Sequence, residues 1–182
     1  MAITINQVEG VPASYPSAPA GLSTAAAALD EAMVWQRIES YIAYRFSSRT
    51  IQWIVEGPGE WTAPLTPATI STVESWSDRA NVWETPTPVL DASPLGGYWL
   101  ACSGPYRFTG TVGGGTVPES VDEAYRRLAE YMAANAGTAG AASQRDEVFG
   151  IGIKEITRSP SWMARAMQNS GAADLLRSYR RA

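Results

Sequence analysis

Histidine is absent from the 182-residue sequence, and cysteine occurs once, at Cys102. Without histidine the chain cannot supply a Ser–His or Cys–His catalytic pair or a histidine-ligated zinc, copper or haem site. A single cysteine excludes an internal disulfide bond and a cysteine-cluster metal site. We interpret Cys102 as a small apolar packing residue rather than a reactive thiol.

Charged residues and long apolar runs are also scarce. Charged side chains make up 18% of the sequence, against about 25% in typical soluble proteins, which predicts that partners cover part of the surface. No apolar run reaches the length of a membrane-spanning helix, and the first residues lack the pattern of a signal peptide. The net charge of −4 argues against a general nucleic-acid-binding protein.

The charge is unevenly distributed along the chain. Residues 158–182 contain five arginines and one acid, a net charge of +4, so the preceding 157 residues carry −8. Such a basic end on an acidic body predicts docking on an acidic partner. A solvated C-terminal helix whose cations complement its own dipole explains the same pattern, and both interpretations stay open.

Hydrophobic residues make up 45% of the chain, enough to form a core. The first 22 residues contain three prolines among small residues, which predicts an extended N-terminal arm. Helical spacing of apolar residues then predicts two amphipathic helices, over Thr24–Tyr44 and Pro118–Asn135. Each has one apolar face, so we expect the two helices to pack as a pair.

The region between these helices predicts a β structure. Alternating, proline-punctuated sequence and turn signals at Gly57–Gly59 separate short extended segments. We expect strands over Ile51–Val55, Glu60–Pro64, Ile70–Trp76, Val82–Thr85, Gly97–Cys102 and Tyr106–Val112. Five of the seven tryptophans lie between Trp53 and Trp99. They favour a small aromatic β core, with a sugar-binding platform as the alternative.

Shorter elements follow the second helix. Residues 136–145 predict a flexible loop, Val148–Ile156 a strand, and Ser159–Gln168 a short helix. A break at residues 169–171 precedes a last helical turn or two, to Arg180. The predicted fold is therefore α+β, an antiparallel helical pair with an inserted Trp-rich antiparallel β region. We divide it into an N-terminal arm (1–22), a core (23–157) and a C-terminal helical arm (158–182).

The glycine-rich turn and the adjacent acidic residues of the sequence do not match known catalytic or nucleotide-binding motifs. Gly113–Gly115 precedes a helix but lacks the lysine of a P-loop and the spaced third glycine of a dinucleotide-binding turn. Adjacent acids at Asp30-Glu31, Asp122-Glu123 and Asp146-Glu147 do not face each other in a helix, so they suggest no glycosidase pair. We predict no enzyme activity, no cofactor and no metal site, and favour an interaction or structural protein.

Two stretches resemble a known family. The run PYRFTGTVGG (residues 105–114) leads into VPESVDEA (residues 117–124), and the chain ends in ARAM (164–167) and SGAADLLRSYRR (170–181). The first resembles the strand, glycine turn, Val-Pro and helix of head–tail connector (adaptor) proteins of long-tailed phages and phage-derived gene transfer agents. The second is similar to that family's Leu-Leu-x-x-Tyr-Arg ending.

This resemblance implies a structural particle protein without catalytic activity or cofactor. Such proteins form a homo-oligomeric ring, usually of twelve subunits, below the portal, and they extend the channel through which DNA passes. The implied partners are the portal protein and a tail-side stopper or tail-terminator protein, at the head–tail junction of a virion or gene-transfer-agent particle assembled in the bacterial cytoplasm. The resemblance also implies that DNA passes through the channel without specific binding. An acidic body agrees with this, because negative charge does not attract DNA phosphates.

The C-terminal arm carries the expected portal-docking residues. Aromatic and arginine side chains are enriched at binding hot spots, and arginine pairs bidentately with carboxylates. The candidates are Trp162, Met163, Arg165, Leu175, Leu176, Arg177, Tyr179, Arg180 and Arg181. The competing interpretation is that this segment folds back as ordinary core, because its short helices must pack on something.

A different function class stays open beside the connector. The Trp-rich region is also compatible with a carbohydrate-binding or adhesin module of a phage tail.

Overall fold

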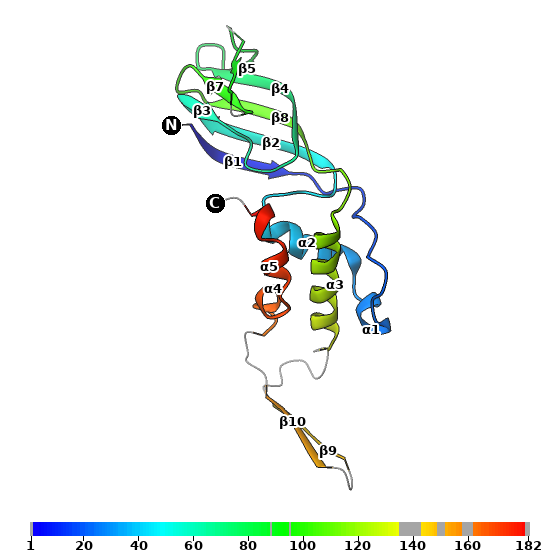
Figure 1. Cartoon of the computed structure of the whole chain (residues 1–182). Helices are drawn as coiled ribbons and strands as arrows, with labels where there is room; N and C mark the ends of the chain where they lie inside the picture. The colour runs from blue at the N-terminus through cyan, green and yellow to red at the C-terminus, as the bar shows by residue number, and fades with distance from the viewer. Residues whose placement is uncertain are drawn as a thin grey trace. The chain divides into compact units, whose positions relative to one another are not determined.

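The computed structural model describes residues 2–87, 89–94, 96–134, 143–148, 152–157 and 162–180, with the backbone alone for 143–148 and 152–157. The chain forms two compact units. The β unit comprises residues 1–16 and 42–116, and the helical unit comprises residues 17–41 and 117–182. Helices and antiparallel sheets are both present, so the predicted α+β class is confirmed (Figure 1).

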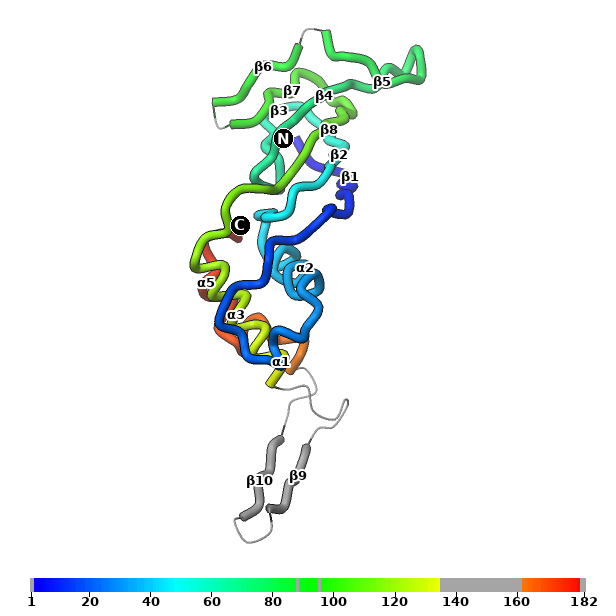
Figure 2. Tube along the Cα trace, turned by 90° about the vertical axis from the view of Figure 1, so that its right-hand side faces the viewer, coloured from blue at the N-terminus to red at the C-terminus, as the bar shows by residue number. Residues whose placement is uncertain are grey.

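A five-stranded antiparallel sheet dominates the β unit. Its strands lie in the order β1-β2-β8-β4-β5 (Figure 1). A smaller antiparallel sheet has the order β3-β7-β6 (Figure 2). Their bounds are β1 Ile3–Glu9, β2 Arg49–Glu56, β3 Gly59–Trp61, β4 Ala68–Ser77, β5 Val82–Glu84, β6 Asp91–Ala92, β7 Tyr98–Leu100 and β8 Tyr106–Val112. Each strand predicted in this region has an observed counterpart: β2 and β4 extend beyond their predicted ends, β8 has the predicted bounds, and β3, β5 and β7 are shorter. The short strand β6 was not predicted.

Aromatic packing forms the core of the β unit. Trp61 stacks on Phe108 with ring centroids 4.2 Å apart, and meets Trp53 edge to face at 5.6 Å. The buried side chains come from one face of β2 and β8 and from the smaller sheet. Gly110 lies so close to β4 that a Cβ there would stand 2.1 Å from the Thr69 carbonyl oxygen. The expectation that tryptophans fill a β core is correct for Trp53 and Trp61.

Helix α3 (Glu119–Ala134) is the centre of the helical unit. It contacts α1 (Thr24–Ala27), α2 (Glu31–Tyr41), α4 (Ala166–Asn169) and α5 (Ala172–Leu175), and Figure 2 shows α1 beside α3. A 3₁₀ turn at Arg177–Tyr179 follows α5. The Trp35 and Tyr125 rings pack 5.1 Å apart between α2 and α3, which confirms that the two predicted helices pack together.

The prediction of one continuous helix over Thr24–Tyr44 is wrong, because the structure has two helices in this range. The range divides into α1 and α2 because Asp30 begins a new helix: its Oδ1 accepts the Ala32 N–H at 3.0 Å and its carbonyl accepts the Val34 N–H at 3.2 Å. Aspartate is a preferred residue at this position because it satisfies amides that lack helical partners. Helix α2 ends at Tyr41, and the Arg45 N–H donates to the Thr66 carbonyl at 2.8 Å instead of continuing a helix.

Two further expectations need correction. Residues 3–9, expected within an N-terminal arm outside the core, form β1, because their backbone pairs with β2 along its length. The single strand expected over Val148–Ile156 is instead a two-stranded sheet of β9 (Ser143–Val148) and β10 (Gly152–Thr157). The pairing of Ser143 with Thr157 extends the strand structure into residues expected to be loop. Residues 136–142, 149–151 and 158–161, which carry parts of these predictions, lie outside the described residues.

Candidate interaction surfaces

The edge strand β1 directs polar side chains toward the core and apolar side chains toward solvent. Directly opposed residues of an antiparallel pair share one face of the sheet. Thr4, Gln7 and Glu9 oppose the buried Val55, Trp53 and Ile51 of β2, so polar side chains of β1 lie on the core side. On the other face Ile3 and Val8 are exposed by 57% and 56%, together with the polar Asn6.

The polar residues of β1 satisfy donors in the aromatic core. The Trp53 indole N–H donates to Gln7 Oε1 at 2.8 Å, and the Trp61 indole N–H donates to Thr4 Oγ1 at 2.9 Å. A buried indole N–H without a partner costs stability, so these bonds complete the core. They also explain why the core side of β1 is polar, and they attach the strand by its side chains as well as its backbone.

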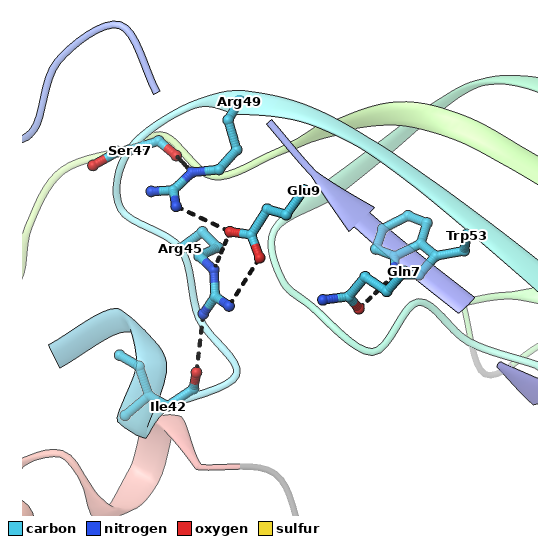
Figure 3. Close-up of polar contacts among 7 residues, drawn as sticks. All are labelled: Gln7, Glu9, Ile42, Arg45, Ser47, Arg49 and Trp53. Carbon is cyan, nitrogen blue, oxygen red and sulfur yellow. Dashed lines mark hydrogen bonds and ion pairs between the residues drawn. The ribbon is translucent and has the colours of Figure 1, made fainter. Parts of the chain in front are cut away.

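Glu9 is the centre of an ion-pair cluster at the end of β1 (Figure 3). Its Oε1 lies 2.7 Å from Arg45 Nε and 2.9 Å from an Arg49 terminal nitrogen, and its Oε2 accepts from Arg45 at 3.2 Å. Arg45 also donates to the Ile42 carbonyl at 3.1 Å and Arg49 to the Ser47 carbonyl at 3.2 Å. Side-chain exposures of 21%, 11% and 7% for Glu9, Arg45 and Arg49 place the cluster largely out of water.

Opposing effects act on the pKa of Glu9. Burial alone would raise it, but the hydrogen bonds and positive charges of Arg45 and Arg49 outweigh burial and hold the pKa below the ordinary value of 4.5. The carboxylate is therefore ionised at neutral pH. It neutralises buried arginine charge and ties β1 to the segment before β2.

We expect Glu9→Gln to destabilise the β unit at pH 7, because it leaves two buried guanidinium groups without their carboxylate, at a cost of about 1–3 kcal/mol. A group with a lowered folded-state pKa contributes stability above its unfolded pKa and loses it as pH falls through the folded value. The difference in melting temperature between the wild type and Glu9→Gln should therefore be largest near neutral pH and shrink below pH 4.5. An equal difference at pH 7 and pH 3 would contradict this role for the ionised carboxylate.

Among the described residues, no second layer buries the face of the five-stranded sheet opposite the aromatic core, which we call the open face. Strand register places Ile54 of β2, Arg107 and Thr109 of β8, and Thr72 and Glu74 of β4 there, and none of them is buried. Glu74 and Arg107 form an ion pair at 2.6 Å. The hydrogen bond from Arg107 lowers the pKa of Glu74, so this pair adds no net charge to the face at neutral pH.

Two tryptophans extend the open face toward the β4–β5 turn. Trp76 and Trp83 are opposed in the register, and their rings meet edge to face at 5.4 Å with an interplanar angle of 67°. The Arg107 guanidinium lies over the Trp83 ring, 4.7 Å from its centroid. Edge-to-face rings do not provide the flat surface on which a sugar stacks, whereas an arginine over a ring is common at protein interfaces.

The predicted docking residues of the C-terminal segment divide by exposure. Arg165, Arg177 and Arg180 are exposed, and four apolar candidates are half-buried: Trp162, Met163, Leu175 and Tyr179. Leu176 is fully buried, so its assignment as a docking residue is wrong for this conformation: its side chain is core of the helical unit. Arg181 lies outside the described residues.

Several contacts attach this segment to the rest of the helical unit. The Met163 carbonyl accepts a hydrogen bond from Arg37 of α2, and the Trp162 and Tyr131 rings lie 6.1 Å apart. The Arg180 guanidinium lies 4.7 Å from the Tyr41 ring centroid and donates to its hydroxyl at 3.2 Å. The interpretation that the segment folds back as core therefore agrees with the structure, and Arg165, Arg177 and Arg180 remain at the surface.

The described ranges offer little for a metal, a membrane or a small ligand. In that part of the chain no group of three or more acidic, cysteine or histidine side chains could hold a metal ion. None of the helices described combines the length and apolar character needed to cross a bilayer. A groove of about 430 Å³ beside α3 is lined in part by Glu123, Arg126 and Arg127, whose charges pair with one another.

Comparison with known proteins adds a distant likeness. No protein-family model matches the sequence, and no curated protein matches it. A chain in a solved structure of the neck of an empty GTA particle, computed with C6 symmetry, has 14% sequence identity to this chain and a TM-score of 0.46. The match covers 93% of this chain and 94% of the other. A likeness of this size assigns neither a family nor a function.

Proposed function

We propose that this chain is a structural head–tail connector of a phage or gene-transfer-agent particle. It forms a ring of identical subunits, expected to number twelve, that joins the portal to a tail-side stopper or tail-terminator protein. DNA passes through the ring without being bound specifically. The chain performs no catalysis and uses no cofactor.

The observation that carries this proposal is the strand–turn–helix at residues 105–124, where the sequence resembles connector proteins. Tyr106–Val112 is strand β8, and Glu119 begins helix α3. Between them Gly113, Gly114 and Gly115 have φ angles of 92°, 99° and 95°, a backbone region that favours glycine. The structure thus has the order of elements that the resemblance implies, and the glycines are explained by backbone geometry without a phosphate ligand.

The charge distribution supports a passive channel and a separate docking site. The −8 charge of residues 1–157 repels DNA phosphates and suits a surface along which DNA slides. The exposed Arg165, Arg177 and Arg180, with the half-buried Tyr179, provide cationic and aromatic contacts for a portal. In this proposal Leu176 acts by holding the segment in place.

The proposal is tested by removing the chain from particle-producing cells and imaging the products by electron microscopy. We expect filled heads and separate tails, because nothing would join the portal to the tail. Supplying the wild-type chain in trans should restore joined particles. Complete, joined particles in the absence of the chain would contradict the connector function.

A further inference from the structure

Within the described part of the chain, strand β1 leaves one edge of the five-stranded sheet open, because it pairs with β2 on one side only. The opposite edge is open in part. Strand β4 pairs with β5 only through Ser75–Ser77, so residues 68–74 have a strand partner on the β8 side alone among the described residues. The sheet therefore offers two backbone edges for hydrogen bonding.

The β1 edge lacks several of the usual protections against pairing. Exposed sheet edges are normally blunted by lysine, by proline or by an outward charge. Here Ile3, Ile5 and Val8 are exposed by 57%, 55% and 56%. The single charge of the strand, Glu9, lies on the core side and is paired with Arg45 and Arg49. The exposed apolar side chains of β1, on an edge without an outward charge, are suited to contact with another protein strand.

The β4 edge can pair with the β1 edge of another copy, because the two strands run in opposite directions and neither edge carries an unpaired charge. Successive strands β1, β2, β8 and β4 are each antiparallel to the next, so β1 and β4 run in opposite directions. A second copy placed beside the first, in the same orientation, would bring β1 of one copy against β4 of the other as an antiparallel pair. Residues 68–74 are rich in threonine and β-branched residues, and their only charge, Glu74, is paired with Arg107.

We infer that β1 of one copy adds to residues 68–74 of β4 in a second copy of this chain, extending the sheet between subunits. The contact joins two different surfaces, so it repeats from copy to copy and closes into a ring when the rotation between copies allows. Pairing of β1 with β1 would instead stop at a dimer. The inference rests on the proposed ring and names its lateral contact. Bulges near Ile5 and Ser71 divide both edges into short runs, so each contact is small.

Disulfide trapping tests this pairing directly. In a Cys102→Ser background, one full-length preparation carries Val8→Cys and the other Thr72→Cys, both on the open face of the sheet. Mixing them at high concentration under mild oxidation should give a covalent heterodimer. The matched control replaces Thr72→Cys by Thr111→Cys, an exposed position on the same face of the central strand β8.

The heterodimer yield with Thr72→Cys should exceed that of the control several-fold. Equal yields from the two mixtures, no covalent heterodimer, or a dominant Val8–Val8 disulfide would each overturn the β1–β4 contact. A cysteine at 72 tests the edge while leaving the Glu74–Arg107 pair intact.

A second experiment places a charged residue on the β1 edge and measures self-assembly. Val8→Lys should weaken self-assembly about tenfold or more, because a charged lysine on an edge strand disfavours pairing with another strand, while the melting temperature stays unchanged. Val11→Lys is the control, since Val11 is 91% exposed and follows the end of β1. Rings that assemble equally well with Val8→Lys would overturn this contact and leave the connector function standing. Trapped β1–β4 pairs in open strings that never close would contradict the ring and retain the contact.

Discussion

Replacement of Leu128 by aspartate is expected to unfold the helical unit. Leu128 is fully buried on α3, on the face that also buries Val121, Ala124, Tyr125, Ala129 and Met132. The substitution removes a packed side chain and places an unpaired carboxylate in the core, which costs about 4 kcal/mol or more. That is a large part of the 5–15 kcal/mol by which typical domains are stable. Thermal unfolding followed by circular dichroism measures the effect.

Ala134→Asp provides a control on the same helix. Ala134 is exposed at the last position of α3, so the same charge should cost less than about 1 kcal/mol, mainly through the helix dipole. If Leu128→Asp melted at the wild-type temperature, the α3 face described as buried would not be core.

Truncation after Gln168 is expected to have a comparably large effect. It removes α5 with the buried Ala172, the buried Leu176 that follows α5, and the Asn169 amide that donates to the Tyr131 hydroxyl at 3.1 Å. Loss of a buried leucine alone costs about 2–5 kcal/mol, so the truncated chain should lose cooperative melting of the helical unit or become insoluble. A truncated chain that melts like the full-length protein would show that the C-terminal segment is not part of the core.

Portal docking must be tested without this loss of structure. Arg177→Ser with Arg180→Ser changes two exposed side chains and should lower the free energy of unfolding by no more than about 1 kcal/mol. Under the proposed function, the double variant should bind portals more weakly than the wild type. Undiminished portal binding by this folded variant would refute the docking role of these arginines.

Local sequence patterns predicted the elements whose periodicity is long and uninterrupted. Alternation over Ile51–Val55 and Tyr106–Val112 identifies β2 and β8, and the 3.6-residue spacing over Val121–Met132 identifies α3. The break between α1 and α2 also had a local signal, because Asp30 is a strong helix-starting residue. The surrounding helix formers concealed it within one apparently continuous pattern.

The polarity of β1 could not be predicted locally. Whether Thr4 or Ile5 faces the core depends on residues far along the chain: Thr4 bonds Trp61, and Gln7 bonds Trp53. The same limit applies to the Leu175-Leu176 pair. In so short a helix periodicity does not determine which leucine is buried, and packing of α5 on α3 buries Leu176.

The copy number of this chain in isolated, tailed particles tests the proposed connector most directly. Mass measurement of the purified neck, together with symmetry analysis of its electron-microscopy images, gives that number. The connector proposal predicts a single ring of identical subunits at the head–tail junction, with twelve copies expected. One or two copies per particle, or a position away from that junction, would contradict it.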